Sequence, residues 1–213
     1  MENGKYRWVN DLSLILLIIC FWGCSSSEEK KDTDTISKEE KLLLENGDII
    51  YRHGNGIFSG YFVSTSQKEQ LYSHAGIISI KGDSIYVIHS EASEFTGIGG
   101  VRKETLQTFL KDISTWGVYR LDTTMVVRDS VALVASNYLN KNISFDFDFN
   151  SLNDDKIYCT ELIALSINKA ASRQLIEAKG KLGSKTYFAV DDTYMIPQMK
   201  KIISHHSENK QSN

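Results

Sequence analysis

Cys159 is the residue of this sequence best placed for nucleophilic chemistry. It stands near the start of a helix predicted for residues 155–171, whose hydrophobic positions crowd its buried sides. Unpaired backbone N–H groups and the positive end of a helix dipole stabilise a thiolate, and they can also hold an oxyanion. The competing interpretation is a small buried hydrophobic residue, which is the commonest state of a free cysteine.

A thiol nucleophile needs a proton acceptor, and a predicted β-hairpin supplies one. Residues 74–80 and 85–91 are β-rich runs on either side of a two-residue turn at Gly82-Asp83, of type II′. This register places His74 opposite Glu91 on the same face, with Cβ atoms about 5 Å apart. A carboxylate beside an imidazole fixes its tautomer and stabilises the imidazolium that forms. We therefore expect His74 to act with Cys159.

The other candidate side chains receive supporting or structural roles. His89 lies on the same face as His74, opposite Gly76, and has no acidic partner in this register. His53 ends a strand and is expected at the surface. Glu161 points around the helix from the thiol and is expected to bond the backbone or a neighbouring loop. Two further histidines fall in the polar C-terminal tail, His205 and His206.

The composition fits one globular domain and excludes several other classes of protein. The chain has 213 residues, of which 41% are hydrophobic, and a net charge of −3. It offers no basic face, so we expect no nucleic-acid partner. Four side chains could supply metal ligands, but no paired spacing such as CxxC or HExxH is present, so neither a metal nor another cofactor is expected. These four are His53, His74, His89 and Cys159.

The N-terminus has the pattern of an export signal. Residues 12–22 form an apolar stretch that is shorter than the about 20 residues needed to span a bilayer, as in the apolar region of a signal peptide. The following Gly23-Cys24 resembles a bacterial lipobox, which implies acylation of Cys24 and a lipoprotein of the cell envelope, anchored in a membrane. A plain signal peptide or a short membrane anchor are the alternatives.

Export changes the interpretation of the remaining thiol. If Cys20 leaves with the signal and Cys24 carries lipid, Cys159 has no disulfide partner within the chain. A lone thiol in an oxidising compartment is exposed to oxidation. We therefore favour a reactive cysteine over a packing residue.

The order of the predicted elements indicates an α+β domain. Strands and helices follow each other without regular βαβ alternation. We divide the chain into a signal peptide at 1–24, a polar tether at 25–41, a folded domain at 42–204 and a polar tail at 205–213. The predicted strands cover 48–53, 74–80, 85–91, 116–121 and 185–190, and the predicted helices cover 104–111, 128–139 and 155–171.

Four segments in this order resemble the permuted papain-like hydrolases of the YiiX/YaeF type, within the NlpC/P60 superfamily. The resemblance implies Cys159 as nucleophile, His74 as general base and then acid, and Glu91 as the residue that orients His74. It implies a papain-like fold with a small, barrel-like antiparallel sheet packed on the nucleophile helix. The segments are Asn46-Gly47-Asp48-Ile49-Ile50, Tyr72-Ser73-His74-Ala75-Gly76-Ile77-Ile78, Ser90-Glu91-Ala92 and Tyr158-Cys159-Thr160-Glu161-Leu162.

The resemblance gives roles to two further residues and suggests a reaction. Tyr158 is expected to contact substrate and Asp48 to order the site, with packing and a structural turn as the alternatives. Cys159 would attack an amide carbonyl to form a thioester, which water or an amine resolves. Amides of cell-wall peptides are the implied substrate. The alternatives are a lipid-directed amidase or acyltransferase, and a lipoprotein that binds a peptide or acyl ligand without turnover.

Overall fold

The computed structural model describes residues 35–56, 59–151 and 154–206. The predicted signal peptide, its lipidation site Cys24 and most of the tether lie outside these residues. Among the described residues, no helix is long and apolar enough to cross a membrane.

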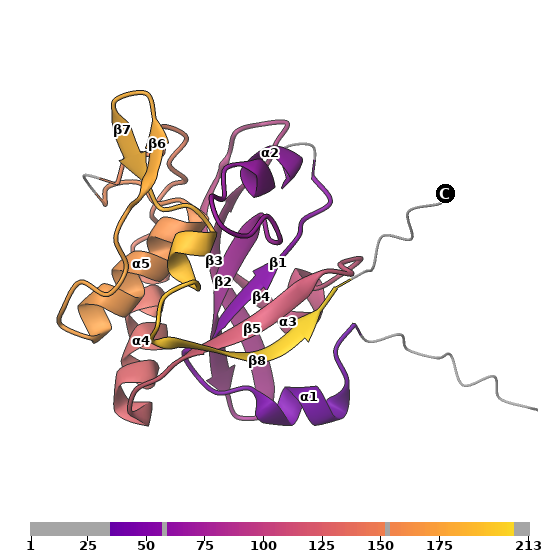
Figure 1. Ribbon diagram of the computed structural model, residues 1–213. Helices are drawn as coiled ribbons and strands as arrows, with labels where there is room; N and C mark the ends of the chain where they lie inside the picture. The colour runs from indigo at the N-terminus through magenta and orange to yellow at the C-terminus, as the bar shows by residue number, and fades with distance from the viewer. Residues whose placement is uncertain (1–34, 57–58, 152–153, 207–213) are drawn as a thin grey trace, which may run out of the picture. The chain divides into compact units, whose positions relative to one another are not determined.

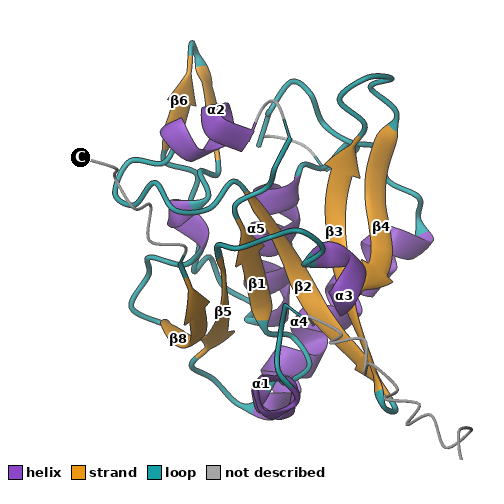
Figure 2. Ribbon diagram, turned by 90° about the vertical axis from the view of Figure 1, so that its right-hand side faces the viewer, coloured by secondary structure: helices purple, strands orange, loops and turns teal. Residues whose placement is uncertain are grey.

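A six-stranded antiparallel sheet forms the centre of the domain (Figures 1 and 2). Its strand order is β4-β3-β2-β1-β5-β8, so β4 and β8 are the two edges and the sheet is open. The barrel-like closure implied by the resemblance is therefore wrong, although the α+β class is confirmed. The strands are β1 Ile49–Arg52, β2 His74–Lys81, β3 Ser84–Ala92, β4 Gly99–Thr105, β5 Trp116–Leu121 and β8 Met199–His205.

Helices cover both faces of this sheet. The two long helices, α4 (Met125–Asn140) and α5 (Cys159–Ala170), lie on one face, and the short α3 (Leu106–Phe109) lies on the other (Figure 2). The remaining elements are α1 Lys38–Leu43, α2 Ser59–Ser64, the hairpin β6 Gly180–Leu182 and β7 Lys185–Tyr187, and a 3-10 turn at Asp191–Thr193.

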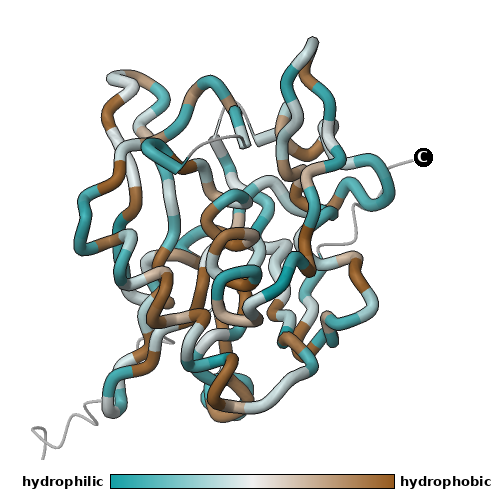
Figure 3. The backbone as a smooth tube through the Cα atoms, turned by 90° about the vertical axis from the view of Figure 1, so that its left-hand side faces the viewer, coloured by the Kyte–Doolittle hydropathy of each residue, from teal (hydrophilic) through white to brown (hydrophobic). Residues whose placement is uncertain are grey.

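Alternating strand residues build two hydrophobic layers. Ile49 and Ile77 face α4 and α5, whereas Ile50 and Ile78 face the layer that contains Phe109. Because both faces are covered, the central strands carry consecutive apolar residues rather than a polar side. Hydrophobic stretches accordingly run through the helices and central strands in Figure 3.

The predicted hairpin register is confirmed. Lys81 pairs with Ser84 and Ile77 with Ile88, and Gly82 has φ +56°, a conformation that glycine adopts without a steric penalty. The ladder between β2 and β3 ends at the Ile77–Ile88 pair. Beyond it, the Ser90 hydroxyl donates to the Ile157 carbonyl at 2.5 Å, which ties β3 to the segment that leads into α5.

Both predicted ends of the folded domain need correction. Ser37 caps α1 inside the predicted tether. At the other end β8 extends to His205, whose ring stacks on Trp116 at 4.4 Å and whose Nε2 lies 2.5 Å from Glu40 Oε1. His205 is therefore part of the sheet and not of a solvated tail. Trp116 and Glu40, which hold His205, lie far from it in the sequence, so the local composition did not reveal these contacts.

Candidate active site

Cys159 is the first residue of α5, and Tyr158 is its N-cap. The helix begins later than the predicted residue 155, and the preceding Asp154 carboxylate pairs with Lys169 Nζ at 2.9 Å. The backbone N–H groups of Ala75 and Thr160 favour the Cys159 thiolate, but burial outweighs them and raises the pKa of the thiol to about 11. Cys159 at rest is therefore a thiol, not the thiolate that its place on the helix suggested.

His74 begins β2, and the backbone N–H of the next residue, Ala75, favours the Cys159 thiolate. The imidazole is nearly buried and stacks on Phe109 with ring centroids 5.7 Å apart. Burial lowers the pKa of His74 well below its usual value, and the positive charges of Arg52 and Arg102 act in the same direction. The imidazole is thus neutral at rest and can accept a proton.

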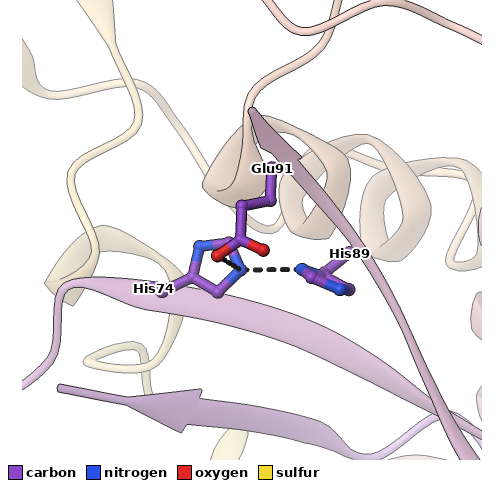
Figure 4. Close-up of side chains that lie close together, drawn as sticks. All are labelled: His74, His89 and Glu91. Atoms are coloured by element: carbon purple, nitrogen blue, oxygen red, sulfur yellow. Dashed lines mark hydrogen bonds and ion pairs between the residues drawn. The ribbon is translucent and has the colours of Figure 1, made fainter. Parts of the chain in front are cut away.

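His89 is the nearest ring partner of His74 (Figure 4). His74 Nε2 lies 2.8 Å from His89 Nδ1 but 3.9 Å from Glu91 Oε1. His74 Nε2 is therefore closer to His89 than to Glu91, the residue predicted to orient it. His89 also has the acidic partner that the hairpin alone did not provide, because Glu104 Oε1 on β4 lies 3.3 Å from His89 Nε2. Sequence reasoning missed Glu104 because residues 104–111 were predicted as a helix and no strand was predicted over β4.

These contacts assign the tautomers of the two histidines. A carboxylate at Nε2 of His89 requires the proton on that nitrogen, so His89 Nδ1 is an acceptor and His74 Nε2 donates to it. In the other tautomer, His89 Nε2 would accept a hydrogen bond from Arg102 Nε at 3.4 Å. The lone pair of that nitrogen would then face the Glu104 carboxylate, which is unfavourable. His74 therefore keeps its Nδ1 lone pair free to act as a base.

Glu91 is held by two arginines rather than by His74. Its Oε1 lies 2.6 Å from Arg52 Nη2, and its Oε2 lies 2.9 Å from Arg102 Nη2. Arg102 also contacts Glu104 at 3.0 Å. The two arginines come from strands β1 and β4, so only the assembled sheet brings them together, and no local sequence signal identified them.

Two cavities meet at Cys159, which lines both. The larger cavity has a volume of about 650 Å³ and contains Arg52, His74 and Glu91. The smaller cavity has a volume of about 290 Å³ and extends between Tyr158 and Phe188. The Cys159 side chain is therefore reachable from both cavities.

The remaining predicted residues are structural or line the site. Tyr158 borders the smaller cavity, and its hydroxyl accepts from the Phe188 N–H at 2.8 Å. Glu161 is buried, its Oε2 accepts from the Tyr158 N–H at 3.4 Å, and burial raises its pKa to about 8. Asp48 is also buried, and Arg120 Nε binds it at 2.7 Å, which supports the structural alternative for this residue.

His53 does not lie at the surface as expected. It is partly buried at the end of β1, and its Nδ1 lies 3.2 Å from the Leu71 carbonyl oxygen.

One cluster in the described part of the chain has the composition of a metal site. Ligand atoms of His74, His89 and Glu91 lie within 4.8 Å of one another. However, the facing nitrogens of the two histidines already share a hydrogen bond, and arginines hold both oxygens of Glu91. The cluster as arranged does not fit a resident cation, because the two facing ring nitrogens bind each other, arginines hold the carboxylate, and their two positive charges lie beside it.

Comparison with known proteins identifies the fold and the family of the chain. In a solved structure, the "metalloprotein yiiX" of Escherichia coli O157:H7, the similar region covers 76% of this chain and 98% of that chain, with a TM-score of 0.63 and 18% identity, a likeness that shows the fold. No curated protein matches the chain. Residues 43–205, which include Cys159 and His74, match the model of a family described as permuted papain-like amidase enzymes. The chain therefore belongs to the YaeF/YiiX family of permuted papain-like cysteine amidases, the C92 family.

Proposed function

We propose that this enzyme hydrolyses amide bonds with Cys159 as nucleophile and His74 as general base. The observation that supports the proposal best is the position of the thiol, which lines both cavities and shares the larger one with His74. The His74 imidazole is held by His89, which in turn contacts Glu104.

The proposed reaction starts from a neutral thiol and a neutral imidazole. As the sulfur attacks the amide carbonyl, His74 Nδ1 takes the thiol proton, and the imidazolium then gives that proton to the departing amine. The resulting thioester is attacked by a water whose proton passes to His74, which releases the carboxylic acid and restores the thiol. His89 and Glu104 stabilise the imidazolium in both halves of the reaction.

Alkylation of Cys159 tests this proposal directly. We expect iodoacetamide to label the folded domain, at a rate that rises with pH beyond 8.5, because burial raises the pKa of the thiol to about 11. The rate is measured from pH 5 to 10 by mass spectrometry on the chain without residues 1–24, with Cys159→Ala as the blank. Labelling that requires denaturant would instead identify Cys159 as a packing residue and favour a lipoprotein that only binds its ligand.

We further propose that Cys24 carries a lipid and holds the enzyme at a membrane of the cell envelope. Replacing Cys24 with alanine is expected to move the protein from the membrane fraction to the soluble fraction, since a lipid anchor would be lost. Cys20→Ala is the matched control and should leave the distribution unchanged. Membrane association that survives Cys24→Ala would indicate an uncleaved anchor instead.

Cell-wall peptides are a proposed substrate class for an exported amidase. The larger cavity favours such polar groups, because charged side chains line it, among them Lys111 and Asp112.

A second candidate, an amidase or acyltransferase for lipid-linked acyl groups, is favoured by the aromatic side chains that the two cavities share. These are Tyr61, Phe62, Phe147 and Phe149.

A further inference from the structure

Exposed apolar side chains gather at the end of the domain where the described chain begins. On α1, Leu42 is 87% exposed and Leu43 is exposed beside it. On the first turn of α4, Val126 is 74% exposed next to the exposed Met125. Single exposed apolar side chains are ordinary on a protein surface, whereas a group of them marks a surface that binds a partner. We call this group the α1–α4 face: Leu42, Leu43, Met125 and Val126.

Ion pairs and a hydrogen bond hold the two parts of this face together. The Glu45 carboxylate, just after α1, binds Arg128 Nη2 of α4 at 2.5 Å and Arg120 Nη1 of β5 at 2.5 Å. Arg120 Nη2 also donates to the Leu43 carbonyl oxygen at 2.7 Å. The end of α1 is therefore fixed beside the start of α4.

The polar segment that follows Cys24 leads directly into α1. Ten residues, 25–34, separate Cys24 from Thr35, where the described chain begins. A fully extended segment of this length reaches about 35 Å, and a domain of this size is expected to be about 40 Å across. Ile36 is buried and Ser37 caps α1, so the chain is fixed to the domain from there. A lipid on Cys24 would therefore keep the α1 end of the domain near the bilayer.

The cavities at Cys159 lie toward the other end of the domain. The helix α2 and the hairpin β6–β7 contribute to their lining and lie at the top of Figures 1 and 2, whereas α1 lies at the bottom. Strand β2 connects the two ends. It begins at His74, which lines the larger cavity, and the Ile80 N–H near its far end donates to Asn46 Oδ1 at 3.1 Å. Six residues of strand span about 20 Å, so a bilayer against α1 leaves the cavities in water.

We infer that the α1–α4 face is a membrane-docking surface, and that the enzyme lies on its bilayer with the cavities directed away from it. The inference goes beyond the proposed hydrolysis and rests on the proposed acylation of Cys24 only for its anchor. The four side chains of the face would leave water and enter the boundary between headgroups and acyl chains. In α1 two lysines balance two glutamates, so the contact depends on apolar side chains and not on anionic lipid.

This orientation has a consequence for the substrate. Acyl lipids of the anchoring bilayer lie on the far side of the domain from Cys159, whereas peptides on the aqueous side can enter the cavities. Docking through the α1–α4 face therefore favours cell-wall peptides over lipids of the same membrane.

Quenching by brominated lipid tests which end of the domain meets the bilayer. We use the chain from Cys24 onward, because residues 34–213 form one compact unit and Trp116 is then its single tryptophan. With Cys159→Ala, a maleimide lipid couples only to Cys24 and anchors the chain to phosphatidylcholine vesicles. A second tryptophan is placed at one exposed position at a time. The loss of its emission with dibrominated phosphatidylcholine is measured relative to the chain with Trp116 alone.

Tryptophans on the docking face should be quenched. Leu42→Trp and Val126→Trp are expected to lose about half of their emission or more, because interfacial side chains are buried about 5–10 Å, within reach of the bromines. Leu133→Trp is the matched control and should lose little, since Leu133 is 61% exposed but lies two turns further along α4. Adding Leu42→Asp to the Val126→Trp chain should restore most of the emission, because a carboxylate resists burial.

A tryptophan beside the larger cavity distinguishes the two ends of the domain. Phe95 is 91% exposed in the loop between β3 and β4, and its neighbour Glu94 lines that cavity. Quenching of Phe95→Trp in place of Leu42→Trp would overturn the inference, because the cavities would then face the bilayer. Quenching at neither position would overturn it as well, because the domain would then stand clear of the bilayer on its tether.

Failure of this inference and failure of the proposed functions give different results. The lipid is coupled chemically and the chain carries Cys159→Ala, so quenching depends neither on acylation in the host nor on turnover. Membrane association that survives Cys24→Ala rejects the lipid anchor, and an active Cys159→Ala rejects the nucleophile. Only the quenching pattern rejects the docking face.

Discussion

Replacing Cys159 with alanine is expected to abolish turnover and leave the fold intact. The substitution removes the atom that forms the thioester, so we expect a loss of about 10⁴-fold or more in kcat. The protein should remain folded, because the residue is only partly buried and a methyl group fits in the space of the thiol. Hydrolysis of an acyl ester or amide measures the loss, and the thermal unfolding midpoint measures the fold.

A serine at this position is the matched variant. Cys159→Ser keeps a group of similar shape and a proton, but a hydroxyl is a far weaker nucleophile beside a neutral imidazole, so it should be nearly as inactive as alanine. Full activity in Cys159→Ala with an unchanged midpoint would end the cysteine amidase proposal for this chain.

The hairpin that carries His74 was predictable because local rules determine it. Gly82 and Asp83 form a two-residue turn, and the alternation of the flanking runs then fixes which residues face each other. The helix that begins at Cys159 was predictable for the same reason, because its pattern of apolar residues is contained within one segment.

The environment of the catalytic groups depends on contacts between distant segments. Glu104 reaches His89 only because β4 pairs with β3, and Arg52 reaches Glu91 from β1. The protonation of Cys159 was also unpredictable. A helix start favours the thiolate, but the degree of burial that reverses this effect exists only in the folded domain.

Substitutions of His89 and Glu91 are expected to affect different properties. His89→Ala removes the acceptor that holds the His74 tautomer, so we expect kcat to fall about 100- to 1,000-fold with little change in KM. Glu91→Gln should instead lower stability by about 1–3 kcal/mol, because it leaves Arg52 and Arg102 without their shared counter-charge while the contact between His74 and His89 persists.

The pH dependence of kcat/KM distinguishes a positioning role of His89 from a merely structural one. Burial, His89 and the two arginines keep the pKa of His74 well below its usual value. The base therefore stays unprotonated as the pH falls below 6.5, and the wild-type enzyme should stay active there. Removing His89 exposes the His74 ring to water and relieves part of the burial that lowers its pKa, so the acidic limb of kcat/KM should move to higher pH. His89→Asn, whose side-chain carbonyl can accept from His74 Nε2, should restore part of kcat. A larger loss of kcat in Glu91→Gln than in His89→Ala would instead return the orienting role to the carboxylate.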